Sequence, residues 1–276
     1  MSSPSRVSPT LCLVGAGNMG GAMLKGWLSS GHDASAITVV DPKPADTMVR
    51  YLAQCGVHHV ANAADAPRPD LIIVAIKPQL MELVLPQLVS LVDGENALLS
   101  VAAGTTIANL SSSFAKVNPR IIRAMPNTPA MVQRGITVCV ANDRVSDAQK
   151  TVVSDVLSAI GQVEWIEDEA LMDAVTGVSG SGPAYVFHLA EALAQAGEAA
   201  GLPPKLAATL ARATVCGAGE LMVQSDVAPA QLRKNVTSPN GTTQAALEIL
   251  MAEDGFPGLL RAAVKAATTR SKQLAG

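Results

Sequence analysis

The chain has 276 residues, which is enough for two ordinary domains or one large one. Its formal net charge of -3 provides no basic field for nucleic acid or an anionic membrane, so a small-molecule partner and a cytoplasmic location are expected. Hydrophobic residues make up 49% and aromatic residues only 3%, which favours close-packed helices with small side chains. The longest uninterrupted apolar run, 71–76, is far shorter than the roughly 20 residues that cross a membrane.

The first ten residues are small and polar, and they lack the hydrophobic core of a signal peptide. A disordered tail is therefore expected at 1–10. The 4 cysteines are scattered without CxxC spacing and are expected to be buried structural side chains. The 4 histidines show no metal-ligand spacing with carboxylates or cysteines either, so no metal site is expected.

Short β-branched runs alternate with helical patterns through the first part of the chain. This alternation predicts an α/β domain at 11–166, built on a parallel, doubly wound sheet with crossover helices. The expected strands are 11–14, 37–40, 57–60, 71–76, 97–101, 120–123, 136–140 and 163–166.

The strand pattern ends near residue 167, and alanine-rich segments with a 3.6-residue period replace it. Glycine and proline residues separate these segments. An all-α second domain is therefore predicted at 167–276. Its expected helical segments are 168–178, 184–200, 203–224, 228–235, 242–252 and 256–274.

A glycine-rich turn follows the first predicted strand and opens a helix, with the pattern G-x-G-x-x-G. Gly15 would make the tight turn, Gly17 would let the backbone approach a pyrophosphate, and Gly20 would let helix and strand pack closely. The helix N-terminus, with Asn18 and Met19, would face the negative charge. The turn therefore predicts a Rossmann-like site for a dinucleotide.

The choice between NADH and NADPH is left open by the residues after the second strand. Asp41 stands where a carboxylate accepts the ribose hydroxyls of NAD and repels a 2′-phosphate. Lys43, two positions on, could attract that phosphate or could be a solvated loop lysine.

Five further motifs resemble the successive signatures of pyrroline-5-carboxylate reductases, and the resemblance runs from residue 11 to about 272. They are A-I-K-P-Q at 75–79, A-A-G at 102–104, R-A-M-P-N-T-P at 123–129, G-V-S-G-S-G-P-A-Y at 177–185 and K-N-V-T-S-P-N-G-T-T at 234–243. The resemblance implies hydride transfer from NAD(P)H to the C=N bond of 1-pyrroline-5-carboxylate, which gives L-proline in the final step of proline biosynthesis. It also implies that the helical domain dimerises, giving an interlocked homodimer or an assembly of such dimers.

Several strand-end residues are expected to line the cofactor. Their backbone would lie at the edge where an open α/β sheet binds its ligand. By resemblance, Asn62 would contact the adenosine ribose. The strand-end residues are Ala75, Lys77, Pro78, Ala102 and Asn127. Lys77 could instead be an exposed strand-end lysine, and Asn127 could merely satisfy a turn.

The segment 238–243 stands at a helix start, where free backbone N–H groups and the helix dipole favour an anion such as the substrate carboxylate. Substrate binding is assigned to Asn240, Gly241 and Thr242, although the family usually has glycine at the first of these. The resemblance places a hydrogen-bonding threonine, Thr243, at the imine nitrogen. Ser238 is the other catalytic candidate in this segment, although it and Thr242 could simply cap the helix.

Ser181 is a third catalytic candidate. It belongs to a glycine- and proline-containing break in an apolar helix, and such a break more often lines a site than fills a core.

Two other functions fit the sequence less well. A β-hydroxyacid dehydrogenase would be expected to carry a catalytic lysine in the first long helix of its helical domain, but 167–201 contains no lysine. A non-catalytic NAD(P)-binding regulatory protein could keep the glycine turn and lose the substrate loop, but 238–243 is intact.

Overall fold

The computed structural model describes residues 8–274. The chain divides into two compact units. The first unit runs to Gly180 and also includes the chain from Thr268 onward, and the second is Ser181–Ala267.

Most of the tail expected at 1–10 lies outside the described residues. Thr10 is described and is held in place, because its backbone N–H and its hydroxyl both donate to Asp70 Oδ2, at 2.8 and 2.7 Å. The ordered backbone therefore includes Thr10.

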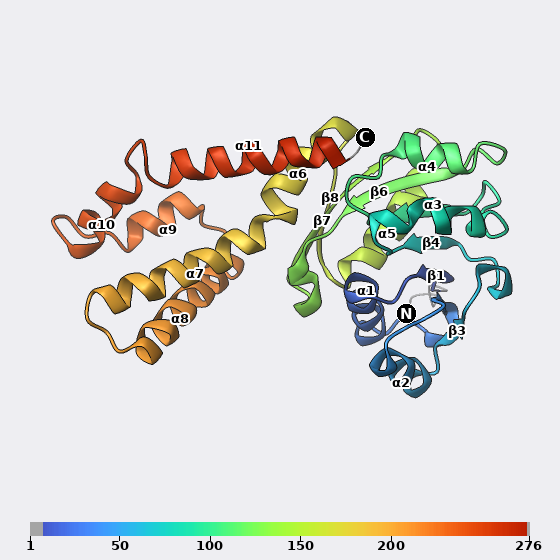
Figure 1. Ribbon diagram of the computed structural model, residues 1–276, viewed down its shortest axis with the longest axis horizontal. Helices are drawn as coiled ribbons and strands as arrows, with labels where there is room; N and C mark the ends of the chain where they lie inside the picture. The colour runs from blue at the N-terminus through green and yellow to red at the C-terminus, as the bar shows by residue number, and fades with distance from the viewer. Residues whose placement is uncertain (1–7, 275–276) are drawn as a thin grey trace, which may run out of the picture. The chain divides into compact units, whose positions relative to one another are not determined.

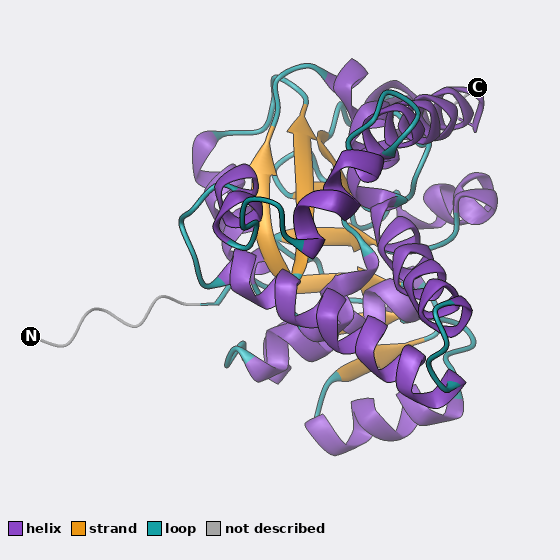
Figure 2. Ribbon diagram, turned by 90° about the vertical axis from the view of Figure 1, so that its left-hand side faces the viewer, coloured by secondary structure: helices purple, strands orange, loops and turns teal. Residues whose placement is uncertain are grey.

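The first unit is built on an eight-stranded sheet in the order β3-β2-β1-β4-β5-β6-β7-β8 (Figure 1). The predicted α/β sheet is confirmed, with small differences at the strand ends. The strands are β1 (Leu11–Val14), β2 (Ile37–Val40), β3 (His58–Val60), β4 (Leu71–Val74), β5 (Ala97–Ser100), β6 (Arg120–Met125), β7 (Gly135–Ala141) and β8 (Gly161–Trp165). Figure 2 shows the twist of this sheet, whose arrows turn progressively in direction.

One pair of strands departs from the all-parallel expectation. β6 and β7 are antiparallel, whereas all other neighbouring strands are parallel. A parallel connection needs a crossover of a dozen or more residues, usually a helix. Between Met125 and Gly135 the chain forms only the short 3-10 helix η5 (Thr128–Val132), so it turns back beside the strand it has just left.

The strand order reverses between β1 and β4. From β1 the sheet grows toward β2 and β3 on one side and toward β4 and β5 on the other. In such sheets a ligand binds at the carboxyl ends of the strands where the order reverses. The glycine turn follows β1 and the A-I-K-P-Q motif follows β4, so both lie at this edge.

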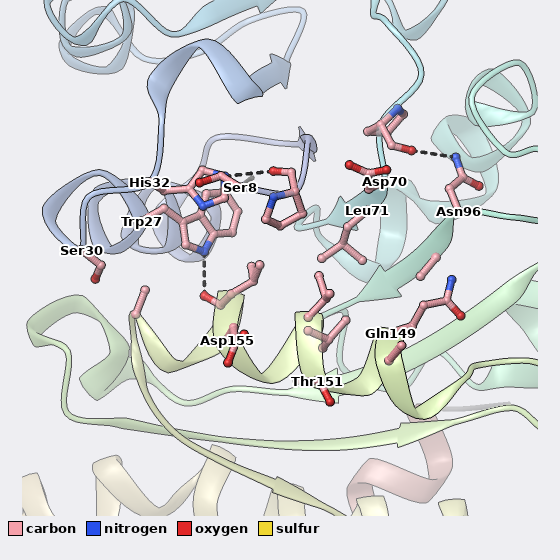
Figure 3. A pocket seen from close by; sticks show the side chains of 18 of the residues that line it. Ser8, Trp27, Ser30, His32, Asp70, Leu71, Asn96, Gln149, Thr151 and Asp155 are labelled. Atoms are coloured by element: carbon pink, nitrogen blue, oxygen red, sulfur yellow. Dashed lines mark hydrogen bonds between the residues drawn. The ribbon is translucent and has the colours of Figure 1, made fainter. Parts of the chain in front are cut away.

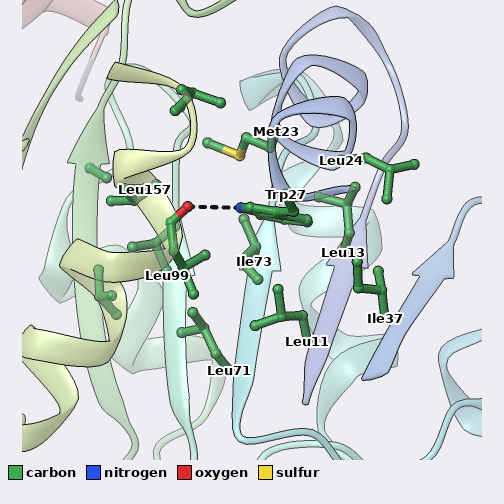
Figure 4. Close-up of a cluster of buried hydrophobic side chains, with 14 of the residues drawn as sticks. Leu11, Leu13, Met23, Leu24, Trp27, Ile37, Leu71, Ile73, Leu99 and Leu157 are labelled. Atoms are coloured by element: carbon green, nitrogen blue, oxygen red, sulfur yellow. Dashed lines mark hydrogen bonds between the residues drawn. The ribbon is translucent and has the colours of Figure 1, made fainter. Parts of the chain in front are cut away.

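Two hydrophobic clusters cover the two faces of the sheet, because alternate side chains of each strand point to opposite faces. Leu11 and Leu13 belong to one cluster, and Cys12 and Val14 belong to the other. The first cluster joins the strands to helices α1 (Asn18–Ser29), α2 (Asp46–Cys55) and α5 (Asp147–Ser158), and the second joins them to α3 (Met81–Val84) and α4 (Ile107–Ser113). Trp27 lies within the first cluster, where its indole N–H donates to Val156 O at 2.9 Å (Figure 4).

The units divide after Gly180, whereas the sequence placed the boundary between residues 166 and 167. The intervening chain packs on the sheet as α6 (Met172–Val175) and a π-helical turn (Thr176–Gly180). Met172 is fully buried beside Val138 and Val140 of β7. These contacts assign the start of the expected helical domain to the first unit.

The second unit is entirely helical, as predicted. It consists of α7 (Gly182–Ala199), α8 (Pro204–Val223), α9 (Pro229–Asn235), α10 (Thr242–Leu250) and most of α11 (Phe256–Leu274). By length and composition, α8 is the one helix within 8–274 that could cross a membrane, with a mean hydropathy of 1.3. An apolar helix that packs on protein has the same composition, and α8 packs on α7.

Candidate functional site

The glycine turn has the geometry that a pyrophosphate requires. Gly15 has φ 91°, and a Cβ there would lie 2.8 Å from Ile76 Cγ2. A Cβ at Gly20 would lie 2.0 Å from Gly15 O, whereas a Cβ at Gly17 would meet nothing within 4 Å. Gly17 is also the N-cap of α1 and has no side-chain cap, so the helix N-terminus is open to an anion. These residues fit a dinucleotide.

A cavity of about 490 Å³ lies beside this turn, at the carboxyl ends of β1, β2 and β4. Six of the residues predicted to bind the cofactor line it: Gly15, Gly17, Asp41, Lys43, Ala75 and Lys77. Within the described part of the chain, no arginine lines this cavity.

The other predicted cofactor residues lie outside this lining. Asn18 and Met19 open α1, Gly20 packs against the turn, and Pro78 begins a 3-10 helix. Asn62 lies between the lining residues Ala61 and Ala63, and its amide donates to Asp65 Oδ2 at 3.3 Å. Ala102 is buried after β5.

The apolar wall of the cavity was missed by reasoning from the sequence. It is formed by Ile76, Leu80, Leu83, Val84 and Leu88. Four of them follow Lys77 at helical spacing, namely Leu80, Leu83, Val84 and Leu88, and Leu83 is 66% exposed. This spacing was the sequence feature that could have revealed the wall. An apolar helix face with an exposed member can pack against a flat ring such as adenine as well as against a core.

Asn127 is used by the fold itself. Its Oδ1 accepts the backbone N–H of Ile136 at 3.0 Å, and its Nδ2 donates to Ser179 Oγ at 3.3 Å. The side chain thus joins the M-P-N-T-P loop to β7 and to the π-helical turn. Cofactor binding by Asn127 stays a prediction, and such a contact would use the remaining amide hydrogen or the backbone of the loop.

A larger cavity, of about 1030 Å³, lies at the opposite edge of the sheet (Figure 3). Asp70 and Leu71 line it from the amino end of β4. The polar groups of two lining residues are already paired within the fold: His32 with Pro9 O, and Asn96 with Pro69 O and Leu91 O. Because open α/β sheets bind ligands at the carboxyl edge, the smaller cavity is the candidate cofactor site.

The predicted substrate loop precedes α10. Asn240 has φ 59°, and its backbone N–H donates to Gln244 Oε1 at 2.8 Å. Gly241 is the N-cap of α10 and no side chain caps this helix, so Ser238 and Thr242 do not act as the caps that the alternative reading required. Thr242 and Thr243 form its first turn, where backbone N–H groups lack helical partners. The loop can therefore bind a carboxylate.

Ser181 lies at the N-terminus of α7. Within the described residues it makes no hydrogen bond to the 238–243 loop. No group of three or more histidine, cysteine or acidic residues that could hold a metal was found between residues 8 and 274.

Two family models match the chain. Residues 169–274 match a family described as pyrroline-5-carboxylate reductase dimerisation, and residues 10–104 match one described as NADP oxidoreductase coenzyme F420-dependent.

Known proteins match over nearly the whole chain. A pyrroline-5-carboxylate reductase of Pseudomonas aeruginosa is 39% identical over 269 residues, which cover 97% of each chain. The structure of a Coxiella burnetii pyrroline-5-carboxylate reductase matches with a TM-score of 0.91 at 32% identity, covering 98% of this chain and 99% of that one. A Plasmodium falciparum pyrroline carboxylate reductase, solved with NADP bound, has a TM-score of 0.81 at 28% identity, covering 99% and 100%. Similarity of this extent, across both units, confirms the resemblance carried by the five motifs: the chain belongs to the pyrroline-5-carboxylate reductase family.

Proposed function

We propose that this chain is an NAD(P)H-dependent pyrroline-5-carboxylate reductase, which makes L-proline from 1-pyrroline-5-carboxylate. The observation that carries the proposal is identity of 39% across 97% of the chain, in a protein that keeps both the glycine turn and the substrate loop.

Each predicted residue has a role in this reaction. The reduced nicotinamide supplies the hydride when the cofactor is bound. The open N-terminus of α10, with Asn240, Gly241 and Thr242, binds the substrate carboxylate. The hydroxyl of Thr243 hydrogen-bonds the imine nitrogen and holds the ring in one orientation. Ser238 and Ser181 are the further polar groups on the substrate side.

The two other candidate functions fit less well. A β-hydroxyacid dehydrogenase would need its lysine, and none occurs in 167–201. A regulatory protein that only binds NAD(P) would not need a substrate loop. This chain keeps the S-P-N-G-T-T segment, and the α10 helix that follows it is uncapped.

The proposal includes a homodimer, or a larger assembly of dimers, in the cytoplasm. The match of 169–274 to a dimerisation family supports the homodimer. The net charge of -3 agrees with a small-molecule partner rather than nucleic acid.

The function is tested by following oxidation of the reduced nicotinamide when purified protein meets the imine. We expect Thr243→Ala to lower kcat/KM by about 10- to 100-fold, the range expected when one substrate hydrogen bond is lost. Thr243→Ser keeps the hydroxyl and should retain most of the activity. A wild-type protein that oxidises neither NADH nor NADPH with this imine would refute the proposal.

A further inference from the structure

Asp41 is the first residue after β2, and it lines the 490 Å³ cavity together with Gly15 and Gly17. An acidic side chain at this place in a doubly wound sheet meets the adenosine ribose at its 2′ position. A 2′-hydroxyl can donate a hydrogen bond to the carboxylate, whereas a 2′-phosphate brings a like charge. The residue therefore decides between the two nicotinamide cofactors, provided it cannot move away.

The carboxylate of Asp41 is held on both oxygens. Oδ2 accepts the backbone N–H of Ala16, within the glycine turn, at 2.8 Å. Oδ1 accepts the backbone N–H of Lys43 at 2.9 Å. A carboxylate has about four acceptor positions, so each oxygen can still accept a ribose hydroxyl.

The backbone of Asp41 is held as well. Its N–H donates to Val60 O at 3.1 Å, and its carbonyl accepts from His59 Nε2 at 2.9 Å. Both partners belong to β3, the neighbouring strand. A 2′-phosphate could not displace the carboxylate without breaking hydrogen bonds to the glycine turn and to the loop after β2.

The basic residues at the cavity offset the repulsion between Asp41 and a 2′-phosphate only weakly. Lys43 and Lys77 line it, but Lys43 is exposed, and an exposed ammonium contributes little to an ionic contact. Its backbone N–H is also already bound to Asp41. Among residues 8–274, no arginine lines the cavity to provide the planar, two-pronged donor that suits a phosphate.

We propose that Asp41 makes this chain an NADH-preferring member of its family. This inference rests on the proposed function, since it concerns the cofactor of the same reaction. The structural relative from P. falciparum was solved with NADP bound, so a chain with this fold can hold the 2′-phosphate.

Direct binding tests the proposal without reference to catalysis. Nicotinamide fluorescence is titrated with wild-type protein, Asp41→Ser and Asp41→Asn, using NADH and NADPH separately. We expect the wild type to bind NADH at least about 10-fold more tightly than NADPH. Both variants should reduce that ratio by about 10-fold, mainly through tighter binding of NADPH. Asp41→Asn keeps the size and one acceptor oxygen, so it covers the case in which Asp41→Ser does not fold.

Lys43→Ala is the comparison variant, and it should change the ratio less than Asp41→Ser does. Tighter binding of NADPH than NADH by the wild type would overturn the proposal. A ratio that stays unchanged in Asp41→Asn, or that shifts more in Lys43→Ala, would also overturn it. A protein that binds NADH tightly but does not reduce the imine would remove the proposed function and leave this preference standing.

Discussion

Asn240 shows how one side chain can replace a glycine in a substrate loop. Its φ of 59° lies in the left-handed region, which costs most side chains about 1–2 kcal/mol and which asparagine tolerates best after glycine. Asparagine can therefore occupy this position of the loop, where the family usually has glycine, with little backbone strain.

Substitutions at Asn240 should therefore separate by backbone conformation. Asn240→Gly should change the free energy of unfolding by less than about 0.5 kcal/mol, whereas Asn240→Val should cost about 1–2 kcal/mol and raise KM for the imine. Urea denaturation and initial rates measure the two effects. Equal behaviour of the two variants would mean that the left-handed conformation is not required. Gly241→Ala is a control for a substitution that disturbs the loop, because its Cβ would lie 2.4 Å from Ser238 Oγ.

Two thiols lie deep in the core of the first unit. Burial raises the pKa of the Cys12 and Cys139 thiols from 9.0 to about 12. Between these values the unfolded chain loses a proton that the folded chain keeps. The contribution of each thiol to stability is therefore complete below about pH 9 and decreases as the pH rises toward 12.

Stability should fall in alkaline solution partly for this reason. Between pH 8 and pH 10 each thiol should account for about 1 kcal/mol of the decrease in the free energy of unfolding. Comparing urea denaturation of wild type and Cys139→Ala at both pH values isolates one thiol, since the other titrating groups are the same. The variant should lose less stability between the two pH values. A loss as large as that of the wild type would show that the buried thiol is not responsible.

An ion pair joins three elements at the carboxyl side of the sheet. Arg123 of β6 donates to Glu169 Oε1 at 2.9 Å, and the same oxygen accepts the N–H of Ile107 at the start of α4, also at 2.9 Å. The Arg123 side chain is only 7% exposed, and that of Glu169 is 29% exposed. Loss of the carboxylate would leave a nearly buried guanidinium without this partner.

Glu169→Ala should therefore destabilise the protein by about 2 kcal/mol, which is below the usual cost for a fully buried pair because Glu169 is partly solvated. Glu169→Gln keeps an acceptor for both donors and should cost about half as much. Chemical denaturation of the two variants provides the measurement. If both variants lose the same stability, the charge rather than the shared hydrogen bonds holds these elements together.

The elements could be predicted where local sequence determines them. The strand Leu71–Val74 is a short run of branched apolar residues, and it is buried on both faces as a central parallel strand should be. The reversal into β7 could not be predicted in the same way, because the strand pattern at 136–140 is identical for either direction. Its direction depends on the short η5 connection and on packing.

The residues of the candidate site also differ in whether local sequence determines them. The glycine turn was predictable because its residues are consecutive. Asn127 was not, because its partners Ile136 and Ser179 are 9 and 52 positions away. The apolar wall from Leu80 to Leu88 becomes part of a site only when its segment packs beside the turn. The division of the compact units after Gly180 could not be predicted for a similar reason, since it depends on the burial of Met172 against β7.

At the scale of the whole molecule, the main feature is that the second unit of a single chain has few buried side chains. No residue of α7 is buried, and α8 buries only Ala207 and Ala211. Phe187 of α7 is 68% exposed, and Leu221 of α8 is 62% exposed. Apolar surface of this extent marks a protein interface, and the family model covering 169–274 is one of dimerisation. A second copy of the chain is the partner that these helices fit.

A dimer raises the question of which copy completes each active site, because the glycine turn and the substrate loop belong to different compact units. We predict that each site combines the turn of one chain with the loop of its partner. Two variants test this: Gly17→Glu, whose side chain would extend from a position with nothing within 4 Å into the pyrophosphate site, and Thr243→Ala. Each variant alone should have little activity.

In a mixed dimer with shared sites, both defects fall in one site and the other site is intact. Random pairing makes about half of the dimers mixed, so co-expression should restore roughly a quarter of wild-type activity. If each chain completes its own site, every site in a mixed dimer carries one defect and activity does not recover. Differently tagged copies, purified through both tags in succession, show whether mixed dimers form and allow their activity to be measured alone. Mixed dimers with no more activity than the variants themselves would establish that the loop serves its own chain.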